Sequence, residues 1–160
     1  MFGGSNDKKD PFHIAIETHR RQREQMMVLE AALPYLQREE ELTKIEKVVD
    51  FFKDKILEHF KWEERYVFPV VSSLGDSEFK QLAEELRAEH VAMTKNFDVL
   101  VDIVVQHGFH FTEEQIKQRF VKTSKALIQA MLAHADKEDA ELYPFIQENG
   151  IQLKGNPLKP

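Results

Sequence analysis

Two short segments of this 160-residue chain repeat one another, and they constrain its fold more than any other feature. Residues 59–69 read HFKWEERYVFP and residues 134–144 read HADKEDAELYP. Each segment has a His, a Glu four positions later, a second acid, an aliphatic residue, an aromatic residue and Pro. Upstream, residues 19–29 and 90–100 also match, since each begins with His and ends with Val-Leu. The chain is therefore predicted to contain two helical hairpins of one kind, paired about an approximate twofold axis.

Apolar residues recur at helical spacing along four long segments, which few glycines and prolines interrupt. Asp10 and Pro11 are expected to begin the first helix, and Pro34 to kink or end it. The charged residues 38–41 are expected to form the first turn. Pro69 and then residues 72–75, Ser-Ser-Leu-Gly, are expected to end the second helix.

Capping signals mark the last two predicted helices. Asp76 is expected to cap the third helix and Gly108 to end it. Thr112 and Gln115 have the spacing of a capping box for the fourth. No segment alternates with a period of two, so the sequence predicts an all-α fold, an up-down-up-down four-helix bundle over residues 10–148. Residues 1–9 are expected to be a flexible N-terminal tail and residues 149–160 a C-terminal tail.

Composition narrows the functional classes. The chain has no Cys, which excludes disulfides, thiolate metal sites, iron–sulfur clusters and cysteine nucleophiles. Its formal net charge of -6 argues against a nucleic-acid partner. Neither a signal peptide nor a membrane-spanning run is visible, so we expect no membrane partner and a cytoplasmic location.

Helix geometry predicts that four of the seven histidines lie in one layer of the bundle. In antiparallel helices, residues equidistant from a turn lie at the same height. The midpoint between His19 and His59 falls within residues 38–41, and that between His59 and His90 falls at residues 74–75. The midpoint between His90 and His134 falls at residue 112, in the third connection. Three expected turns therefore place these four histidines together.

Two glutamates share the apolar helix faces with these histidines. A lone core His is better explained as a hydrogen-bonded structural residue, and a lone His–Glu pair as a surface pair. The repeat, the apolar positions and the three midpoints together favour a shared site, because buried charges are costly unless they are paired or bound to metal. The predicted metal ligands are His19, His59, Glu63, His90, His134 and Glu138. His13, His107 and His110 are interpreted as lying outside the site.

Imidazole and carboxylate donors without sulfur suit Fe, Mn and Zn and disfavour Cu(I) and purely structural zinc. Four histidines and two glutamates that can bridge indicate two metal ions, each with two histidines and with open positions for a small ligand. Such an arrangement favours redox or dioxygen chemistry. The sequence therefore predicts iron, two per chain, with Mn or Zn as less favoured alternatives.

The pattern resembles the hemerythrin-like, HHE cation-binding family over about residues 10–148. HFKWEE at residues 59–64 is similar to the family's second-helix motif, and His19, His90 and residues 134–138 match its remaining ligand positions. The resemblance implies a four-helix bundle with a non-haem, usually di-iron, centre. It also implies a role in oxygen binding, oxygen or iron sensing, iron storage, or repair of damaged iron centres.

The sequence departs from the oxygen carriers of this family in two places. Carriers have H-x-x-x-H on the third helix, whereas His90 has Leu86 and Thr94 at that spacing. Carriers place an Asp five residues after the fourth-helix His, whereas Glu138 follows His134 by four. The fifth histidine is therefore missing or supplied elsewhere, which argues against a carrier-like cycle but not against a metal site.

Three functions remain open at this stage. The leading hypothesis is a di-iron protein that binds or senses dioxygen or a related small oxidant. The rival is an oxidase or peroxidase-like, iron-storage or iron-centre repair activity at the same centre. The third is a module whose metal only stabilises the bundle. A sensor would need a separate protein partner, since the sequence predicts one domain.

Overall fold

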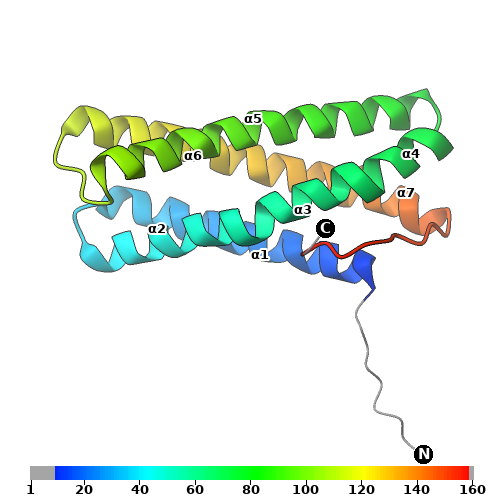
Figure 1. Cartoon of the computed structure of the whole chain (residues 1–160), viewed down its shortest axis with the longest axis horizontal. Helices are drawn as coiled ribbons and strands as arrows, with labels where there is room; N and C mark the ends of the chain where they lie inside the picture. Colours follow the sequence, from blue (N-terminus) through cyan, green and yellow to red (C-terminus); the bar gives the residue numbers. More distant parts are fainter. Residues whose placement is uncertain (1–9, 159–160) are drawn as a thin grey trace, which may run out of the picture.

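The computed structural model describes residues 10–158, which form four long helical rods and no strand. The first rod is α1 (Pro11–Ala32) with a 3₁₀ turn, η1 (Leu33–Tyr35). The second comprises α2 (Glu39–Phe51), η2 (Phe52–Ile56), α3 (Leu57–Trp62), η3 (Glu63–Val67) and α4 (Phe68–Leu74). The third is α5 (Ser77–His107), and the fourth comprises α6 (Glu114–Lys137), η4 (Glu138–Leu142) and α7 (Tyr143–Glu148). Connections alternate between the two ends, which confirms the all-α up-down-up-down bundle (Figure 1).

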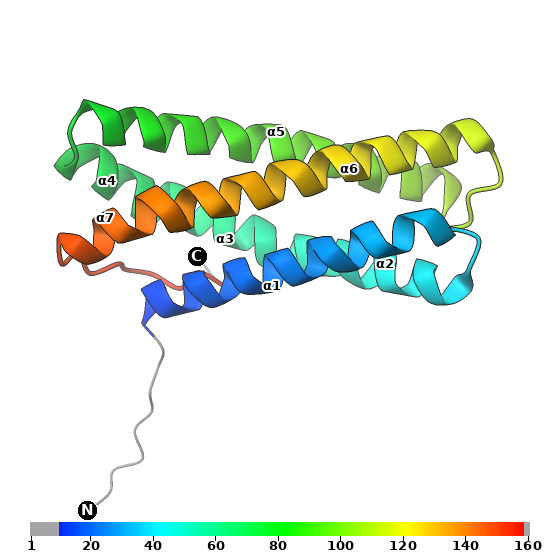
Figure 2. The ribbon, with the colours of Figure 1, turned by 180° about the vertical axis from the view of Figure 1, so that it is seen from behind.

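Packing between the first and last rods closes the bundle. Seen from behind, α1 lies beside α6, and α5 lies on the other side of α6 (Figure 2). Within the part of the chain that the structure describes, no helix is long and apolar enough to cross a membrane. The expected flexible tail at residues 1–9 lies outside the described residues, as do residues 159–160.

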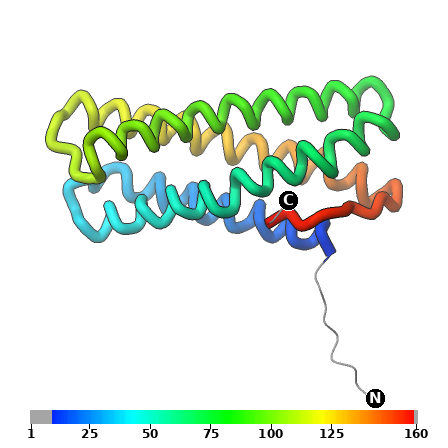
Figure 3. Tube along the Cα trace, in the orientation of Figure 1, coloured from blue at the N-terminus to red at the C-terminus, as the bar shows by residue number. Residues whose placement is uncertain are grey.

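The segment after α7 turns back along the bundle as extended chain, red in Figure 3. The indole N–H of Trp62 donates to the carbonyl of Lys154 at 2.7 Å. Gly155 has φ 77°, and a Cβ there would come within 2.5 Å of the Tyr66 ring. Only glycine fits this close approach without strain. The segment is therefore packed against the helix that carries Trp62.

Three of the expected helix ends are confirmed. The Asp10 carboxylate accepts a hydrogen bond from the backbone N–H of His13 at 2.9 Å and caps α1. The Asp76 carboxylate accepts from the N–H groups of residues 78 and 79 and caps α5. Gly108 ends α5 with φ 70°. Side chains that satisfy free N–H groups, and a glycine at positive φ, set these boundaries.

Two other expectations about helix ends are wrong. Residues 39–41 are the first turn of α2 rather than a loop, since three Glu side chains are favourable at the positive end of a helix. Thr112 does not cap the fourth rod; Glu113 is its N-cap residue and makes no side-chain capping bond.

The end of the second rod lies within the expected residues 72–75. Pro69 lies inside α4, which continues to Leu74 and has Gly75 as its C-cap residue.

A wide helical turn precedes each proline of the repeat. In η3 the N–H of Phe68 donates to the carbonyl of Glu63, and in η4 the N–H of Tyr143 donates to the carbonyl of Glu138, both in π-helical geometry. A proline ring clashes with the carbonyl four residues earlier and offers no N–H. Widening the preceding turn relieves this conflict, so both rods continue through their prolines. A further π turn, η2, is not followed by proline.

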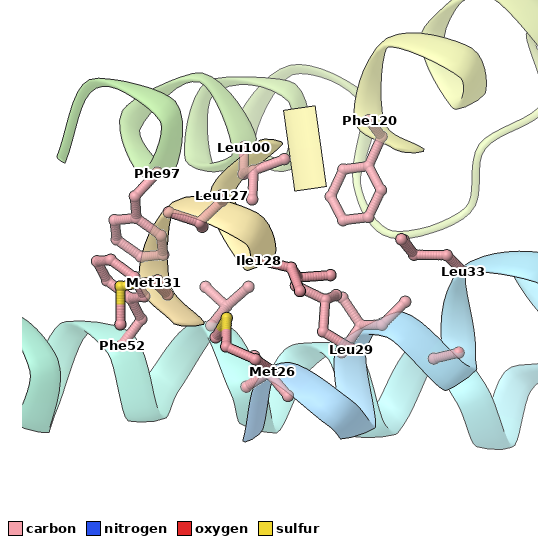
Figure 4. Close-up of a cluster of buried hydrophobic side chains, with 14 of the residues drawn as sticks. Met26, Leu29, Leu33, Phe52, Phe97, Leu100, Phe120, Leu127, Ile128 and Met131 are labelled. Carbon is pink, nitrogen blue, oxygen red and sulfur yellow. The ribbon is translucent and has the colours of Figure 1, made fainter. Parts of the chain in front are cut away.

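The apolar core is divided into two clusters. The first packs the bundle end that contains the residue 36–38 and 108–113 connections, and Figure 4 shows part of it. In this cluster the rings of Phe52 and Phe97 stack with their centroids 4.0 Å apart. The second cluster packs the other end and includes Trp62, Phe68, Leu86 and Tyr143. A layer of buried polar side chains lies between the two clusters along the length of the bundle.

Candidate metal centre

The six predicted ligands come together inside the bundle. Each is between 0% and 1% exposed, although none is apolar. Every rod contributes at least one of them: His19 from α1, His59 and Glu63 from the second rod, His90 from α5, and His134 and Glu138 from the fourth. The layer that the three midpoints predict is therefore present, even though the first turn lies slightly earlier than expected.

The four histidines form two pairs. The Nε2 atoms of His19 and His59 lie 3.0 Å apart. The Nε2 atoms of His90 and His134 also lie 3.0 Å apart. All four Nε2 atoms therefore face the interior of the layer, and their Nδ1 atoms face outward.

Each glutamate joins the two histidine pairs. Oε1 of Glu63 lies 3.3 Å from Nε2 of both His59 and His90. Oε1 of Glu138 lies 3.2 Å from Nε2 of the other member of each pair. The six ligand atoms thus form a closed ring, in which each atom is 3.0 to 3.3 Å from its two neighbours.

The ring has the dimensions of a metal site. Two nitrogen or oxygen donors about 2.1 Å from a common ion lie roughly 3.0–3.4 Å apart at ordinary coordination angles. Two groups of four residues meet this condition, with ligand atoms within 4.8 Å of one another: His19, His59, Glu63 and Glu138, and Glu63, His90, His134 and Glu138. Because both groups contain the two glutamates, the ring can hold two cations that share them.

Three of the four carboxylate oxygens of the ring lack hydrogen-bond donors. Oε1 of Glu63 and both oxygens of Glu138 are buried and receive no hydrogen bond of proper geometry from residues 10–158. Buried carboxylates without donors or cations are strongly unfavourable. The donor set and these orphaned atoms fit a bound cation.

The imidazoles of the ring are basic. Burial lowers the pKa of His19, but the hydrogen bond to Asp139 and the negative charge of Glu138 outweigh it and raise the pKa to about 10. Burial also lowers the pKa of His134, but the charge of Glu138 and the hydrogen bond to Glu89 outweigh it and raise the pKa to about 10. Burial raises the pKa of the Glu63 carboxyl, but the neighbouring histidines lower it well below its usual value. Positive charge is thus favoured in this layer, whether it comes from protons or from metal.

Outer carboxylates fix three of the four imidazoles. Nδ1 of His19 lies 2.7 Å from Asp139, Nδ1 of His90 lies 3.1 Å from Glu64, and Nδ1 of His134 lies 3.1 Å from Glu89. Such partners orient metal-binding histidines and make them better ligands. Nδ1 of His59 is buried and has no partner among the described residues.

Two of these carboxylates are held in turn by cations. Arg23 donates to Asp139 at 2.6 Å, and Lys137 donates to Glu89 at 2.7 Å. The sequence reading missed both carboxylates and Glu64. A signal was present for Glu64 and Asp139, since each is the second acid of its repeat.

Tyr143 is the other functional residue that the sequence reading missed. Its hydroxyl donates to Oε2 of Glu63 at 2.9 Å, and its ring lies edge-on to His19 with centroids 5.3 Å apart. Burial and the charges of Glu63 and Glu138 raise the pKa of Tyr143 well above its usual value. The phenol therefore stays protonated and acts as a donor.

The remaining histidines lie away from the ring, as predicted. His13 is 69% exposed and bonds the Asp10 carboxylate. His107 and His110 are exposed beside the connection between α5 and α6. The fifth histidine of the oxygen carriers has no counterpart at the two spacings considered. Leu86 is buried in the second apolar cluster, and Thr94 lines a groove.

That groove lies between α3 and α5 and has a volume of about 330 Å³. Phe60 and His90 are part of its lining, and their rings stack with centroids 3.9 Å apart. Glu64 also lines it, so the groove reaches the outer side of one imidazole and not the centre of the ring.

These features define an all-α bundle with a buried His/Glu site suited to a metal cation. Comparison with known protein families matches residues 10–146 to the hemerythrin HHE cation binding domain. The match covers most of the chain, and the chain belongs to this family. Comparisons with curated proteins and with solved structures found no match.

Proposed function

We propose that this protein is a di-iron protein whose centre reacts with dioxygen or a related small oxidant. The observation that carries the proposal is the closed ring of ligand atoms, in which two groups of four share both glutamates. Nitrogen and oxygen donors of this kind suit iron, and Mn and Zn are the alternatives.

In this proposal each residue of the ring has one role. His19 and His59 would hold one ion, and His90 and His134 would hold the other. Glu63 and Glu138 belong to both groups of four and would be shared. When bound, iron supplies the electrons that dioxygen chemistry requires. The outer carboxylates orient the imidazoles and keep protons on their Nδ1 atoms. Tyr143 orients Glu63 through the hydrogen bond that its phenol donates.

Burial of the ring supports a small reactant. All six ligands are at most 1% exposed, and apolar clusters pack at both ends of the bundle. A molecule larger than a few atoms would need the helices to separate before it could reach the metal-facing atoms. Bulk water is excluded by the same packing, which strengthens every electrostatic interaction inside.

A second candidate function is an oxidase or peroxidase-like activity, iron storage or iron-centre repair at the same site. Two imidazoles per ion and two shared carboxylates favour it, because a donor set with more carboxylate stabilises oxidised iron. The absence of a fifth histidine at residues 86 and 94 points the same way.

Metal analysis and visible spectroscopy test the proposal. Protein loaded anaerobically with Fe(II) is expected to hold two irons per chain and to change its visible absorption when oxygen or hydrogen peroxide is added. One tightly bound zinc and no spectral response would contradict it. Reversal of the change under vacuum supports binding or sensing, whereas repeated turnover of peroxide or added Fe(II) supports the second candidate.

A further inference from the structure

The two halves of the metal centre match closely, which makes their differences informative. The repeat pairs His19 with His90, Glu63 with Glu138, and Phe68 with Tyr143. The structure keeps this correspondence: the Phe68 ring lies 5.3 Å from the His90 ring, and the Tyr143 ring lies 5.3 Å from the His19 ring.

The two halves differ at one oxygen atom, the hydroxyl of Tyr143, which Phe68 lacks. Tyr143 has a hydroxyl that donates to Oε2 of Glu63 at 2.9 Å. The equivalent ring in the other half is Phe68, which has no donor. Oε1 of both glutamates lacks a donor in the described part of the chain, but Oε2 lacks one only in Glu138.

We propose that Tyr143 is a positioning residue that fixes Glu63 as the stationary bridging carboxylate and leaves Glu138 as the carboxylate that changes its binding mode. This inference rests on the proposed function, since it concerns how the two glutamates hold the metal ions.

Geometry distinguishes the two oxygens of Glu63. Oε1 faces the nitrogen atoms of His59 and His90 at 3.3 Å, whereas Oε2 is occupied by the phenol. Glu63 is therefore restricted to binding through Oε1. Because Tyr143 is 1% exposed, water does not compete with the phenol for this oxygen.

Glu138 has no such restraint on its second oxygen. Oε1 faces the nitrogen atoms of His19 and His134 at 3.2 Å, and Oε2 is buried without a donor. This carboxylate can move from one bound oxygen to two without breaking a hydrogen bond. Glu138 would therefore be the carboxylate that is free to rearrange, while the phenol of Tyr143 holds Glu63 in place.

Tyr143→Phe tests the inference, with Tyr35→Phe as the matched control. Tyr35 is 41% exposed in the first connection, at the opposite end of the bundle from α7. Each protein is loaded with Zn(II), which is redox-silent, and zinc content, zinc affinity and infrared carboxylate stretches are measured. ¹³C-labelled glutamate identifies the Glu bands. A carboxylate bound through one oxygen has a wider separation between its two stretches than one bound through two.

The wild-type protein and Tyr35→Phe are expected to show two pairs of Glu stretches. The pair from Glu63 has the wide separation, and the pair from Glu138 has a narrower one. Tyr143→Phe is expected to lose the wide pair and to bind zinc about tenfold more weakly, as for other lost outer partners of metal ligands. Two bound zinc ions with an unchanged infrared spectrum in Tyr143→Phe would overturn the inference alone. Fewer than two zinc ions in the wild-type protein would overturn the proposed function and the inference with it.

Discussion

His19 shows how a fully buried side chain can carry a proton. Burial of the imidazole lowers its pKa, but Asp139 and Glu138 more than compensate, and the pKa rises to about 10. His134 reaches a pKa of about 10 through Glu138 and Glu89. At pH 7 the metal-free centre therefore contains at least two protonated imidazoles, those of His19 and His134, and a bound metal ion must displace their protons.

Proton release on metal binding follows from these raised pKa values. At pH 7 we expect about two protons to leave the chain as two metal ions bind, one each from His19 and His134. Zinc titration by calorimetry in buffers of different ionisation enthalpy measures the number. The apparent metal affinity is expected to rise as the pH rises toward 10. Metal binding without proton release would contradict the assigned charge state.

The outer carboxylates provide a test at single residues. Asp139→Asn removes the negative charge that faces Nδ1 of His19, and we expect metal affinity to fall about 10- to 100-fold. Asp136→Asn is the matched control, because Asp136 also accepts from Arg23 but is 71% exposed and bonds no histidine. Equal loss of affinity in both variants would mean that Asp139 acts only through Arg23.

At the scale of the element, the aromatic-Pro pairs link helix geometry to the site. Each π turn begins at a ring glutamate and ends just before the aromatic residue that packs on a histidine. A regular α-helix would rotate that aromatic residue by about 100°. The wide turn is therefore part of how the site is built.

Replacing the proline after η4 tests this link. Pro144→Ala removes the ring that requires the wide turn, so η4 should relax to an α turn and carry Tyr143 away from Glu63. We expect metal affinity to fall at least about tenfold, as for loss of an outer partner. The substitution Ala140→Ser, at an exposed position of the same turn, keeps the proline and serves as the control in zinc titrations. Unchanged affinity in Pro144→Ala would show that the site does not depend on the π turn.

At the scale of the whole molecule, a charged layer lies between two apolar clusters. In the metal-free protein this layer is held by protonated histidines and carboxylates. The pKa of His19 is raised on folding, so its stabilising contribution is complete below pH 6.5 and is lost as the pH rises through about 10. His134 behaves in the same way.

The metal-free protein is therefore expected to lose thermal stability between pH 6.5 and 10. Zinc at about 100 times its Kd should add about 2.7 kcal/mol to the free energy of unfolding for each ion bound. Thermal unfolding with chelator and with zinc, at pH 6.5, 8 and 9.5, measures both effects. His59→Ala should remove the zinc effect and His107→Ala should keep it. A metal-free protein that becomes more stable toward pH 9.5 would contradict the assigned charges.

Much of the fold was predictable because it depends on long-range periodicity. Helical spacing and the repeat indicate the four rods, and the midpoints place His19 and His90 at one height even though residues 39–41 are helical. Cap details at Thr112 depend on local backbone geometry, which residue identity alone does not determine. Glu89 and Tyr143 could not be assigned because their roles depend on which helix faces which across the bundle.

The number of metal ions held by the ring tests the central claim most directly. Wild-type protein and His107→Ala, loaded anaerobically with Fe(II) and freed of excess metal, should each hold two irons per chain. His59→Ala should hold no more than one iron and Glu63→Ala fewer than one, and both should remain helical by circular dichroism. Loss of iron from His107→Ala, or two irons retained in folded His59→Ala and Glu63→Ala, would contradict the account.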